Sequence, residues 1–259
     1  MQEFLNRVIH GDCSEIMQYM PSDSVDLTVT SPPYDDLRKY NGFVFPFEEI
    51  AKGLYRVTKQ GGVVVWVVGD ATVKGSETGT SFKQALYFKE IGFNLHDTMI
   101  YKKNNGQSGS NKCYKQVFEY MFVFSKGKIK TVNLIRDLPN KRAGEKRIIT
   151  KRKQDGTLKK ENFIVNEFSK RTNIWEIDCG YMITTKDKFA YEHPAMFPEK
   201  LAEDHILSWS NPGDIVFDPM CGAGTTLKMA YANNRDFIGI DYSVEYVELS
   251  QERLKKVMS

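Results

Sequence analysis

The sequence IVFDPMCGAGTTLKMAYANNRDFIGID, residues 215–241, decides the fold of this 259-residue chain. An apolar strand ends at Asp218, and the chain then turns through Pro219, Gly222 and Gly224 into a helical stretch. A second apolar strand follows and ends at Asp241. A strand, a glycine-containing turn, a helix and a further strand form the unit that places ligands at the carboxyl edge of an α/β sheet. The stretch therefore predicts an α/β fold with a ligand site at this turn, although a turn that needs glycine only for packing would have the same sequence.

The details of the turn narrow the kind of ligand. A third glycine, which a dinucleotide fingerprint needs, is missing, and no Gly-Lys-Ser/Thr follows to cradle phosphates. Asp241 ends the next strand about 20 residues after the turn, where a carboxylate can accept both hydroxyls of a ribose. The pattern favours a nucleoside ligand without a pyrophosphate, and it leaves Cys221 as a small packing residue.

Elsewhere, short apolar strands alternate with amphipathic helical stretches, which indicates a sheet covered by helices. The first two helices are expected to end at the glycines that follow them, Gly61–Gly62 and Gly92. Two glycine- and serine-rich stretches, residues 70–81 and 102–112, follow strands and are expected to be ligand-contacting loops. The expected strands are residues 25–30, 63–68, 96–102, 119–125, 214–218 and 236–241, and the expected helices are residues 46–59, 81–91, 198–210 and 244–258.

A second motif, Thr30-Ser31-Pro32-Pro33-Tyr34, follows the strand at residues 25–30. Two consecutive prolines fix φ and continue neither a sheet nor a helix, so the turn is rigid and rich in acceptors. The Ser31 hydroxyl, the Pro32 carbonyl and the Tyr34 ring together suit a planar group that bears an exocyclic amine. A proline-stiffened loop whose tyrosine fills the core is the alternative.

The charge of the chain is concentrated in one segment. The net charge is +3, but residues 126–171 hold 15 Lys and Arg against 5 Asp and Glu, so this segment carries +10 and the rest of the chain −7. Such a segment indicates a surface that faces a polyanion, with a merely solvated basic surface as the alternative. Its densest run is Lys151-Arg152-Lys153.

Length and composition exclude several other classes of protein. The length fits one large domain, or one domain with a sizeable insertion. Four scattered cysteines offer neither a Cys-x-x-Cys pair for zinc nor a secreted disulfide framework, so we expect no metal and a cytoplasmic protein. The longest apolar run, residues 63–68, is far shorter than the ~20 residues of a membrane span, so we expect no membrane association.

Together, TSPPY, FDPMCGAGTT and FIGID resemble the amino-methylating DNA methyltransferases that use S-adenosylmethionine. The order, with the catalytic motif first, the basic segment in the middle and the cofactor motif last, is similar to the circularly permuted β group of that family. The resemblance covers nearly the whole chain and implies a Rossmann-like methyltransferase sheet with an inserted basic target-recognition region. On this basis residues 1–125 and 172–259 would form the catalytic and cofactor-binding domain, and residues 126–171 the target-recognition insertion.

The resemblance also implies roles for individual residues. NRVIHGDCSEIM at residues 6–17 is similar to the strand and loop that hold adenine, and HPAMFPEKL at residues 193–201 to the motif that helps enclose methionine. Because the chain ends soon after FIGID, the N-terminus must supply the next strand of the sheet. The implied cofactor-binding residues are Asp12, Cys13, Asp218, Pro219, Gly222, Gly224, Thr225 and Asp241; the catalytic residues are Ser31, Pro32, Pro33 and Tyr34; the DNA-binding residues are Lys151, Arg152 and Lys153.

A serine at position 31 resembles the cytosine-N4 subgroup, whereas an aspartate there is commoner in adenine-N6 enzymes. The sequence therefore predicts a site-specific enzyme that methylates the N4 amine of a flipped cytosine in double-stranded DNA, in a restriction-modification or epigenetic context. Adenine N6 is the alternative target. RNA or protein methylation and a catalytically silent DNA-binding relative are more remote alternatives, and the chain could form a homodimer or share its recognition site with a restriction endonuclease.

Overall fold

A computed structural model describes residues 1–33, 45–107, 113–193 and 195–258. The chain divides into two compact units, which are described separately below. The larger comprises Met1–Asn133 and Asn173–Ser259, and the smaller comprises Leu134–Thr172.

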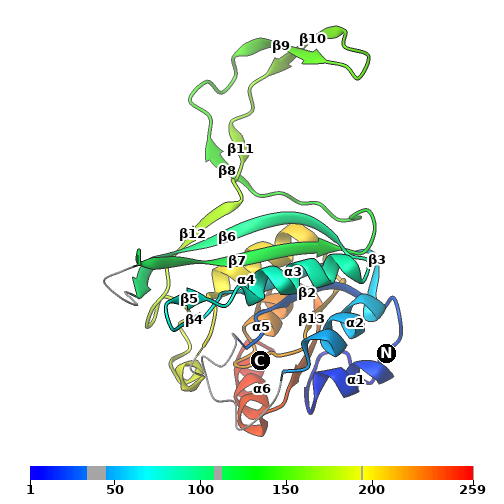
Figure 1. Ribbon diagram of the computed structural model, residues 1–259, viewed down its shortest axis with the longest axis vertical. Helices are drawn as coiled ribbons and strands as arrows, with labels where there is room; N and C mark the ends of the chain where they lie inside the picture. Colours follow the sequence, from blue (N-terminus) through cyan, green and yellow to red (C-terminus); the bar gives the residue numbers. More distant parts are fainter. Residues whose placement is uncertain (34–44, 108–112, 194, 259) are drawn as a thin grey trace. The chain divides into compact units, whose positions relative to one another are not determined.

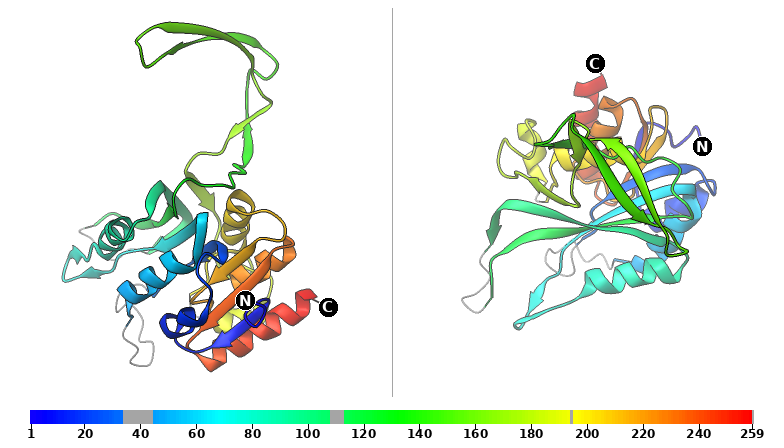
Figure 2. Two further views of the ribbon diagram at one scale, coloured as in Figure 1. Left: turned by 90° about the vertical axis from the view of Figure 1, so that its right-hand side faces the viewer. Right: turned by 90° about the horizontal axis from the view of Figure 1, so that it is seen from above.

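The larger unit is built on a sheet in which the described residues form eight strands. All neighbours pair in parallel except β7, which is antiparallel to both β3 and β6. Figures 1 and 2 show helices on both faces of this sheet. In spatial order the strands are β1 (Arg7–His10), β14 (Asp236–Asp241), β13 (Ile215–Asp218), β2 (Val25–Thr30), β3 (Thr58–Val68), β7 (Gln116–Ser125), β6 (Asn94–Gln107) and β12 (Ile174–Ile177).

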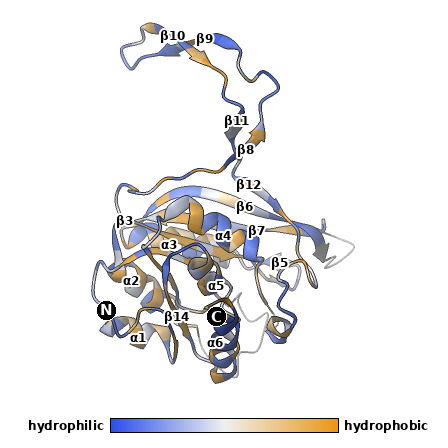
Figure 3. Ribbon diagram, turned by 180° about the vertical axis from the view of Figure 1, so that it is seen from behind, coloured by the Kyte–Doolittle hydropathy of each residue, from blue (hydrophilic) through white to orange (hydrophobic). Residues whose placement is uncertain are grey.

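Each face of the sheet is buried under its own group of helices. One hydrophobic cluster joins the sheet to α4 (Glu199–Trp209), α5 (Thr225–Ala232) and α6 (Val244–Met258). The other joins it to α1 (Cys13–Tyr19), α2 (Phe47–Val57) and α3 (Thr80–Glu90). Figure 3 shows hydrophobic residues along the strands and along the helix stretches that cover them.

The run VVVWVV in β3 explains why the sheet must be covered twice. Val63, Val65 and Val67 belong to the first cluster, whereas Val64, Trp66 and Val68 belong to the second. Successive side chains of a strand point to opposite faces, so a continuous apolar run buries both.

Most of the expected elements are confirmed. All six expected strands form, with β2 and β14 having the expected bounds, and the four expected helices form α2, α3, α4 and α6. The N-terminal strand β1 pairs in parallel with β14, which confirms that the N-terminus supplies the next strand. The circular permutation itself stays a prediction.

The predicted end of one helix was wrong. The helix expected to run to Gly61–Gly62 ends at Val57, and both glycines lie inside β3. The β-branched Thr58 already has extended backbone and belongs to the strand, and a Cβ on Gly62 would lie 2.9 Å from the Asp26 carbonyl oxygen. Gly62 therefore permits close approach of β3 to β2 and does not end a helix.

The two expected loops are partly regular. Residues 102–107 continue β6, and residues 108–112 lie outside the described part of the chain. Residues 70–81 contain the short strands β4 (Thr72–Val73) and β5 (Ser76–Glu77) and the start of α3. A 3₁₀ helix, η2 (Lys188–Glu192), precedes α4. Within the described residues, no helix is both long enough and apolar enough to cross a membrane.

The smaller unit consists of two antiparallel pairs. Strands β8 (Arg136–Pro139) and β11 (Phe168–Lys170) pair with each other, as do β9 (Lys146–Arg152) and β10 (Leu158–Ile164). None of the core clusters among the described residues includes a residue of this unit. It begins at Leu134, so the first eight residues of the basic segment, 126–133, belong to the larger unit.

A neutral histidine is built into the core of the larger unit. His205 of α4 is fully buried; its Nε2 lies 3.2 Å from Met121 Sδ, and its Nδ1 accepts from Trp209 Nε1 at 3.3 Å. Burial lowers the pKa of His205 to about 3. The His205 imidazole therefore becomes protonated near pH 6.5 in the unfolded chain but only near pH 3 in the folded chain.

We expect this difference to make the protein sensitive to acid. A depressed folded pKa contributes stability above the unfolded pKa and loses it as pH falls, so between pH 7 and 5 His205 should cost about 2 kcal/mol of unfolding free energy. Urea denaturation at both pH values should show this loss in the wild type and a smaller one in His205→Gln. The matched variant His96→Gln, at an exposed histidine, should keep the wild-type loss; equal losses in all three proteins would contradict the assignment.

Candidate functional site

A cavity of about 950 Å³ opens at the carboxyl ends of the central strands. Parallel strands place the loops that follow them along one edge of the sheet, so stretches distant in the sequence meet there. The loops after β1, β13, β2 and β14 all contribute. The lining is Gly11–Cys13, Ser31–Pro33, Ile50, Tyr101, Lys103, Glu119, Cys179, His193, Ala195–Phe197, Asp218–Ala223, Thr225 and Asp241–Tyr246.

The cavity brings together most of the residues expected from the sequence. Five of the expected residues are not among the described lining residues, for different reasons. Gly224 is the N-cap of α5 and packs on Ser250, and Tyr34 lies outside the described residues. Lys151–Lys153 belongs to the smaller unit. The expected residues that line the cavity are Asp12, Cys13, Ser31, Pro32, Pro33, Asp218, Pro219, Gly222, Thr225 and Asp241.

Asp241 is held rigidly at the end of β14. Its Oδ2 accepts from the Gly222 backbone N–H at 2.7 Å, and its Oδ1 accepts from the Ser243 N–H at 2.9 Å. Burial raises the pKa of Asp241 against the opposing effect of these two N–H groups. Each carboxylate oxygen has two lone pairs, so both can accept a further hydrogen bond, as a ribose diol would require.

Asp12 is the N-cap of α1, directly after β1. Its Oδ1 accepts from both the backbone N–H and the hydroxyl of Ser14, at 2.7 and 2.6 Å. This cap fixes the side chain at the cavity wall. Cys13, the next residue, is buried, and burial raises the pKa of its thiol, so it stays a neutral packing group.

Asp218 joins the two chemical motifs. Its Oδ1 accepts from Thr30 Oγ1 at 2.8 Å and from the Met220 backbone N–H at 3.1 Å. Thr30 ends β2 immediately before Ser31, so this bond fixes the Ser-Pro-Pro turn against the glycine turn. Burial raises the pKa of Asp218 to about 7, while the Thr30 hydroxyl and the Met220 N–H lower it.

The glycine turn itself approaches its neighbours closely. Gly222 has φ +50, and a Cβ there would lie 2.7 Å from His193 Nε2. Ser250 of α6 donates to the Gly222 carbonyl at 2.6 Å. The His193 ring lies 4.3 Å from that of Tyr246, centroid to centroid, and both residues line the cavity. Any side chain at position 222 would displace the residue that follows η2.

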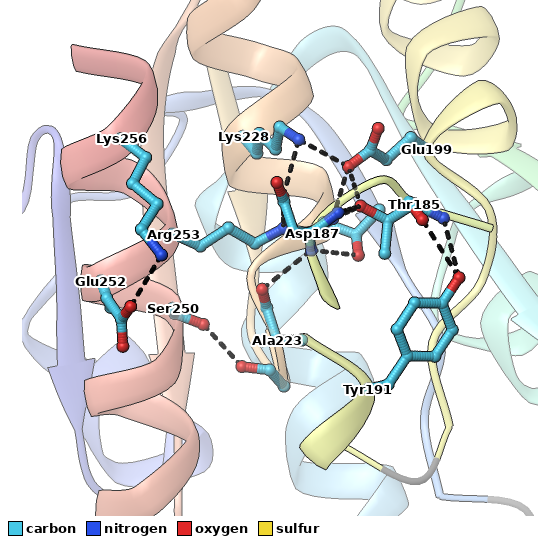
Figure 4. A network of polar contacts seen from close by, with 12 residues as sticks. Thr185, Asp187, Tyr191, Glu199, Ala223, Lys228, Ser250, Glu252, Arg253 and Lys256 are labelled. Atoms are coloured by element: carbon cyan, nitrogen blue, oxygen red, sulfur yellow. Dashed lines mark hydrogen bonds and ion pairs between the residues drawn. The ribbon is translucent and has the colours of Figure 1, made fainter. Parts of the chain in front are cut away.

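Behind this turn lies a buried ion-pair network that sequence reasoning missed (Figure 4). Arg253 of α6, whose side chain is only 1% exposed, is its centre. It donates to the Ala223 carbonyl at 3.0 Å and to Thr225 Oγ1 at 2.9 Å, which are both parts of the cavity wall. It also pairs with Asp187 at 2.7 Å and with Glu199 at 2.5 Å.

The network extends from α6 to the segment that leads into α4. Lys228 of α5 contacts the same two carboxylates, Asp187 at 2.8 Å and Glu199 at 2.7 Å, so two cations balance two anions. Thr185 accepts from Arg253 and donates to Glu199. Residues 185–199 include His193 and residues 195–197 of the cavity wall, so the network joins this segment to the wall formed by the glycine turn. The available signal was an arginine on the buried stripe of α6, four residues after Leu249.

Two further lining residues lie on β6 and β7. Lys103 and Glu119 form an ion pair beside the buried Tyr101. Lys103 lies two residues after Tyr101, and Glu119 lies two residues before Met121. Tyr101 and Met121 belong to the hydrophobic cluster that also contains Val29. Alternation along the strands therefore places Lys103 and Glu119 on the face of the sheet that bears Val29. Among the described residues, no group of three or more His, Cys, Asp or Glu could hold a metal ion.

Comparison with known proteins identifies the family of the chain. Residues 25–252 match the DNA methylase family. The orphan methyltransferase M.BamHII of Bacillus amyloliquefaciens is 60% identical over 250 residues, which cover 95% of this chain and 90% of that protein. The DNA adenine methyltransferase YhdJ of Escherichia coli (strain K12) is 26% identical over 251 residues, which cover 95% and 82%.

The structure of PvuII DNA methyltransferase, which is described as cytosine-N4-specific, has the same fold. Its TM-score is 0.67 at 20% identity, over 97% of this chain and 89% of that one. This likeness confirms the expected α/β methyltransferase sheet. The family match covers most of the chain and includes both the Ser-Pro-Pro turn and the glycine turn. The chain therefore belongs to the N6/N4 family of DNA methylases, as its motifs implied.

Proposed function

We propose that this DNA methyltransferase transfers a methyl group to the N4 amine of a cytosine that has been flipped out of duplex DNA. The observation that carries the proposal is that Ser31 and Pro32 line one cavity together with Asp12, Gly222 and Asp241. An amine acceptor site and a nucleoside site thus share a single space. S-adenosylmethionine is the cofactor of this family, and it supplies an electrophilic methyl group when bound.

The cavity fits that cofactor. A volume of about 950 Å³ lies at the upper end of ligand-site sizes, so a flipped base has room beside the nucleoside. Asp241 would hold the ribose hydroxyls, Asp12 the adenine amine, and the turn at Pro219–Thr225 the methionine end. The Arg253 network would keep the walls of that end in place.

Our proposed mechanism is direct displacement without a covalent enzyme intermediate. The Ser31 hydroxyl and the Pro32 carbonyl accept hydrogen bonds from the target amine and so raise electron density on its nitrogen. Two prolines and the Thr30–Asp218 bond hold these acceptors in line with the cofactor site, which supplies orientation. Neutral serine is a poor base, so the amine proton leaves late, to solvent.

The assignment to cytosine rests on Ser31, because a serine at the first position of the motif resembles the cytosine-N4 subgroup. The PvuII enzyme, with the same fold, is described as cytosine-N4-specific. Adenine N6 is the second candidate, because YhdJ, which is named an adenine methyltransferase, is the more similar in sequence. A restriction-modification or epigenetic role, a homodimer and a cognate endonuclease stay predictions.

Methyl transfer from labelled S-adenosylmethionine tests the substrate class. With duplex DNA, duplex RNA and peptide offered separately to the full-length protein, we expect label only in DNA. Label in RNA or peptide alone would overturn the proposal, and binding of the cofactor and of DNA without any transfer would establish the catalytically silent alternative.

Asp241→Ala is expected to weaken S-adenosylmethionine binding by about 1–3 kcal/mol, because charge-assisted hydrogen bonds to the ribose are lost. Titration calorimetry measures this effect directly. Asp236→Ala, at the other end of β14, is the matched control and should leave the affinity unchanged. Equal affinities for all three folded proteins would remove Asp241 from the site.

A further inference from the structure

The β9–β10 hairpin has two faces of different character, which its register defines. Cross-strand pairs run from Lys146 opposite Ile164 to Arg152 opposite Leu158. Because side chains alternate, every second pair shares a face. One face, here called the acid-containing face, consists of Arg147, Ile149, Lys151, Lys159, Glu161 and Phe163. The other, here called the acid-free face, consists of Lys146, Ile148, Thr150, Arg152, Leu158, Lys160, Asn162 and Ile164.

On the acid-containing face, much of the positive charge is already paired. Glu161 contacts Lys151 at 2.6 Å and Lys159 at 3.0 Å. The ammonium groups of both lysines hold the pKa of Glu161 at about 2, so it is ionised at neutral pH. This carboxylate would also repel a phosphate backbone.

The acid-free face combines exposed cations and neutral polar groups with the exposed apolar side chains of Ile148, Leu158 and Ile164. Its three cations, Lys146, Arg152 and Lys160, are exposed, and no carboxylate is among its eight residues. The exposed Thr150 and Asn162 lie in the two central pairs, between the cations at either end. A hydroxyl and an amide are donors and acceptors that can bind base edges, and asparagine can bind adenine with two bonds.

The length of the acid-free face also matches the major groove of B-DNA. Six residue steps separate Lys146 from Arg152, so the strand between them spans about 20 Å, or about six base pairs. A two-stranded β-ribbon fits the major groove of B-DNA, whose walls are lined by phosphates. Lys146 and Arg152 at the two ends of β9, with Thr150 and Asn162 between them, match that arrangement, and Lys160 lies opposite Thr150 on the second strand.

We propose that the acid-free face of the β9–β10 hairpin enters the major groove, with Lys146, Arg152 and Lys160 on phosphates and Asn162 and Thr150 on base edges. The inference rests on duplex DNA being the substrate, as proposed above. This proposal divides the basic run at residues 151–153, which the sequence predicts to bind DNA as a whole. Lys151 lies on the acid-containing face and pairs with Glu161, whereas Arg152 lies on the acid-free face. Lys153 lies at the hairpin turn, where its backbone N–H donates to the Thr157 carbonyl.

Two double variants of the full-length protein, matched in charge, test the phosphate contacts. Lys146→Ala with Lys160→Ala changes the acid-free face, and Lys151→Ala with Lys159→Ala changes the other face by the same charge. Fluorescence anisotropy with duplex DNA over a range of salt gives the slope of log affinity against log salt. We expect the first double variant to reduce its magnitude by about 2, since each phosphate contact contributes about 0.9, and the second to leave it near the wild-type value. Equal reductions in both, or a reduction only in the second, would overturn the assignment of the face.

Base reading is tested separately by the recognition sequence. Methylome sequencing of cells that express Asn162→Ala should show one position of the methylated sequence relaxed by about tenfold relative to the wild type. The isosteric Thr150→Val should relax a neighbouring position. An unchanged sequence in both variants would overturn their role as readers. If the wild type binds duplex DNA but methylates none, the proposed function fails, while the salt slopes still decide between the faces.

Discussion

Arg253→Met is expected to lower the free energy of unfolding by about 3–5 kcal/mol, which is the cost of breaking a buried ion pair by removing one partner. The substitution would leave Asp187 and Glu199 with Lys228 as the remaining cation of the network. The Ala223 carbonyl and the Thr225 hydroxyl would also lose their bonds to the guanidinium. Urea denaturation followed by circular dichroism measures the change.

Lys256→Met on the same helix is the matched control. Its Nζ pairs with Glu252, one turn earlier, and lies 3.5 Å from the centroid of the Phe189 ring. Both charged side chains are more than half exposed, so the loss should stay below about 1 kcal/mol. Arg253→Lys keeps the charge but not the planar set of guanidinium donors, so its loss of unfolding free energy should fall between those of Arg253→Met and Lys256→Met. Wild-type stability in Arg253→Met would show that the network does not support the fold.

Ser31→Ala is expected to reduce turnover by about 10- to 100-fold, because an acceptor is lost at the reacting nitrogen, where the hydrogen bond strengthens in the transition state. Affinity for S-adenosylmethionine should stay unchanged, since Asp241 and Asp12 are intact. Single-turnover methylation and calorimetry separate the two quantities. Ser24→Ala, just before β2 at its opposite end, should keep wild-type turnover. A turnover in Ser31→Ala equal to that of the wild type would remove the hydroxyl from the mechanism.

Much of the fold could be predicted because its signals are local. The apolar run in β3, the turn after Asp218 and the stripes of α3, α4 and α6 each specify an element without reference to the rest of the chain. The pairing of β1 with β14 was expected from the likeness of residues 6–17 to the strand and loop that hold adenine in the family. The end of α2 could not be predicted, because Gly62 is needed for close packing of β3 against β2, and the sequence alone does not show that contact.

The candidate site could be predicted where it follows parallel strands. Asp12, Ser31, Asp218 and Asp241 each end or follow such a strand, so their loops had to meet at one edge. The ion pair on β6 and β7 depends on an antiparallel register that no local pattern specifies. The two faces of the β9–β10 hairpin likewise depend on register, which is why a dense basic run seemed a single binding surface.

Nucleoside mass spectrometry of duplex DNA that the wild-type protein has methylated with S-adenosylmethionine identifies the target atom. Digestion to nucleosides separates the three methylated products by mass and retention. We expect N4-methylcytosine, because Ser31 and Pro32 are proposed to accept hydrogen bonds from an exocyclic amine. N6-methyladenine would contradict the assignment to cytosine while keeping the direct displacement, and 5-methylcytosine would contradict the mechanism itself.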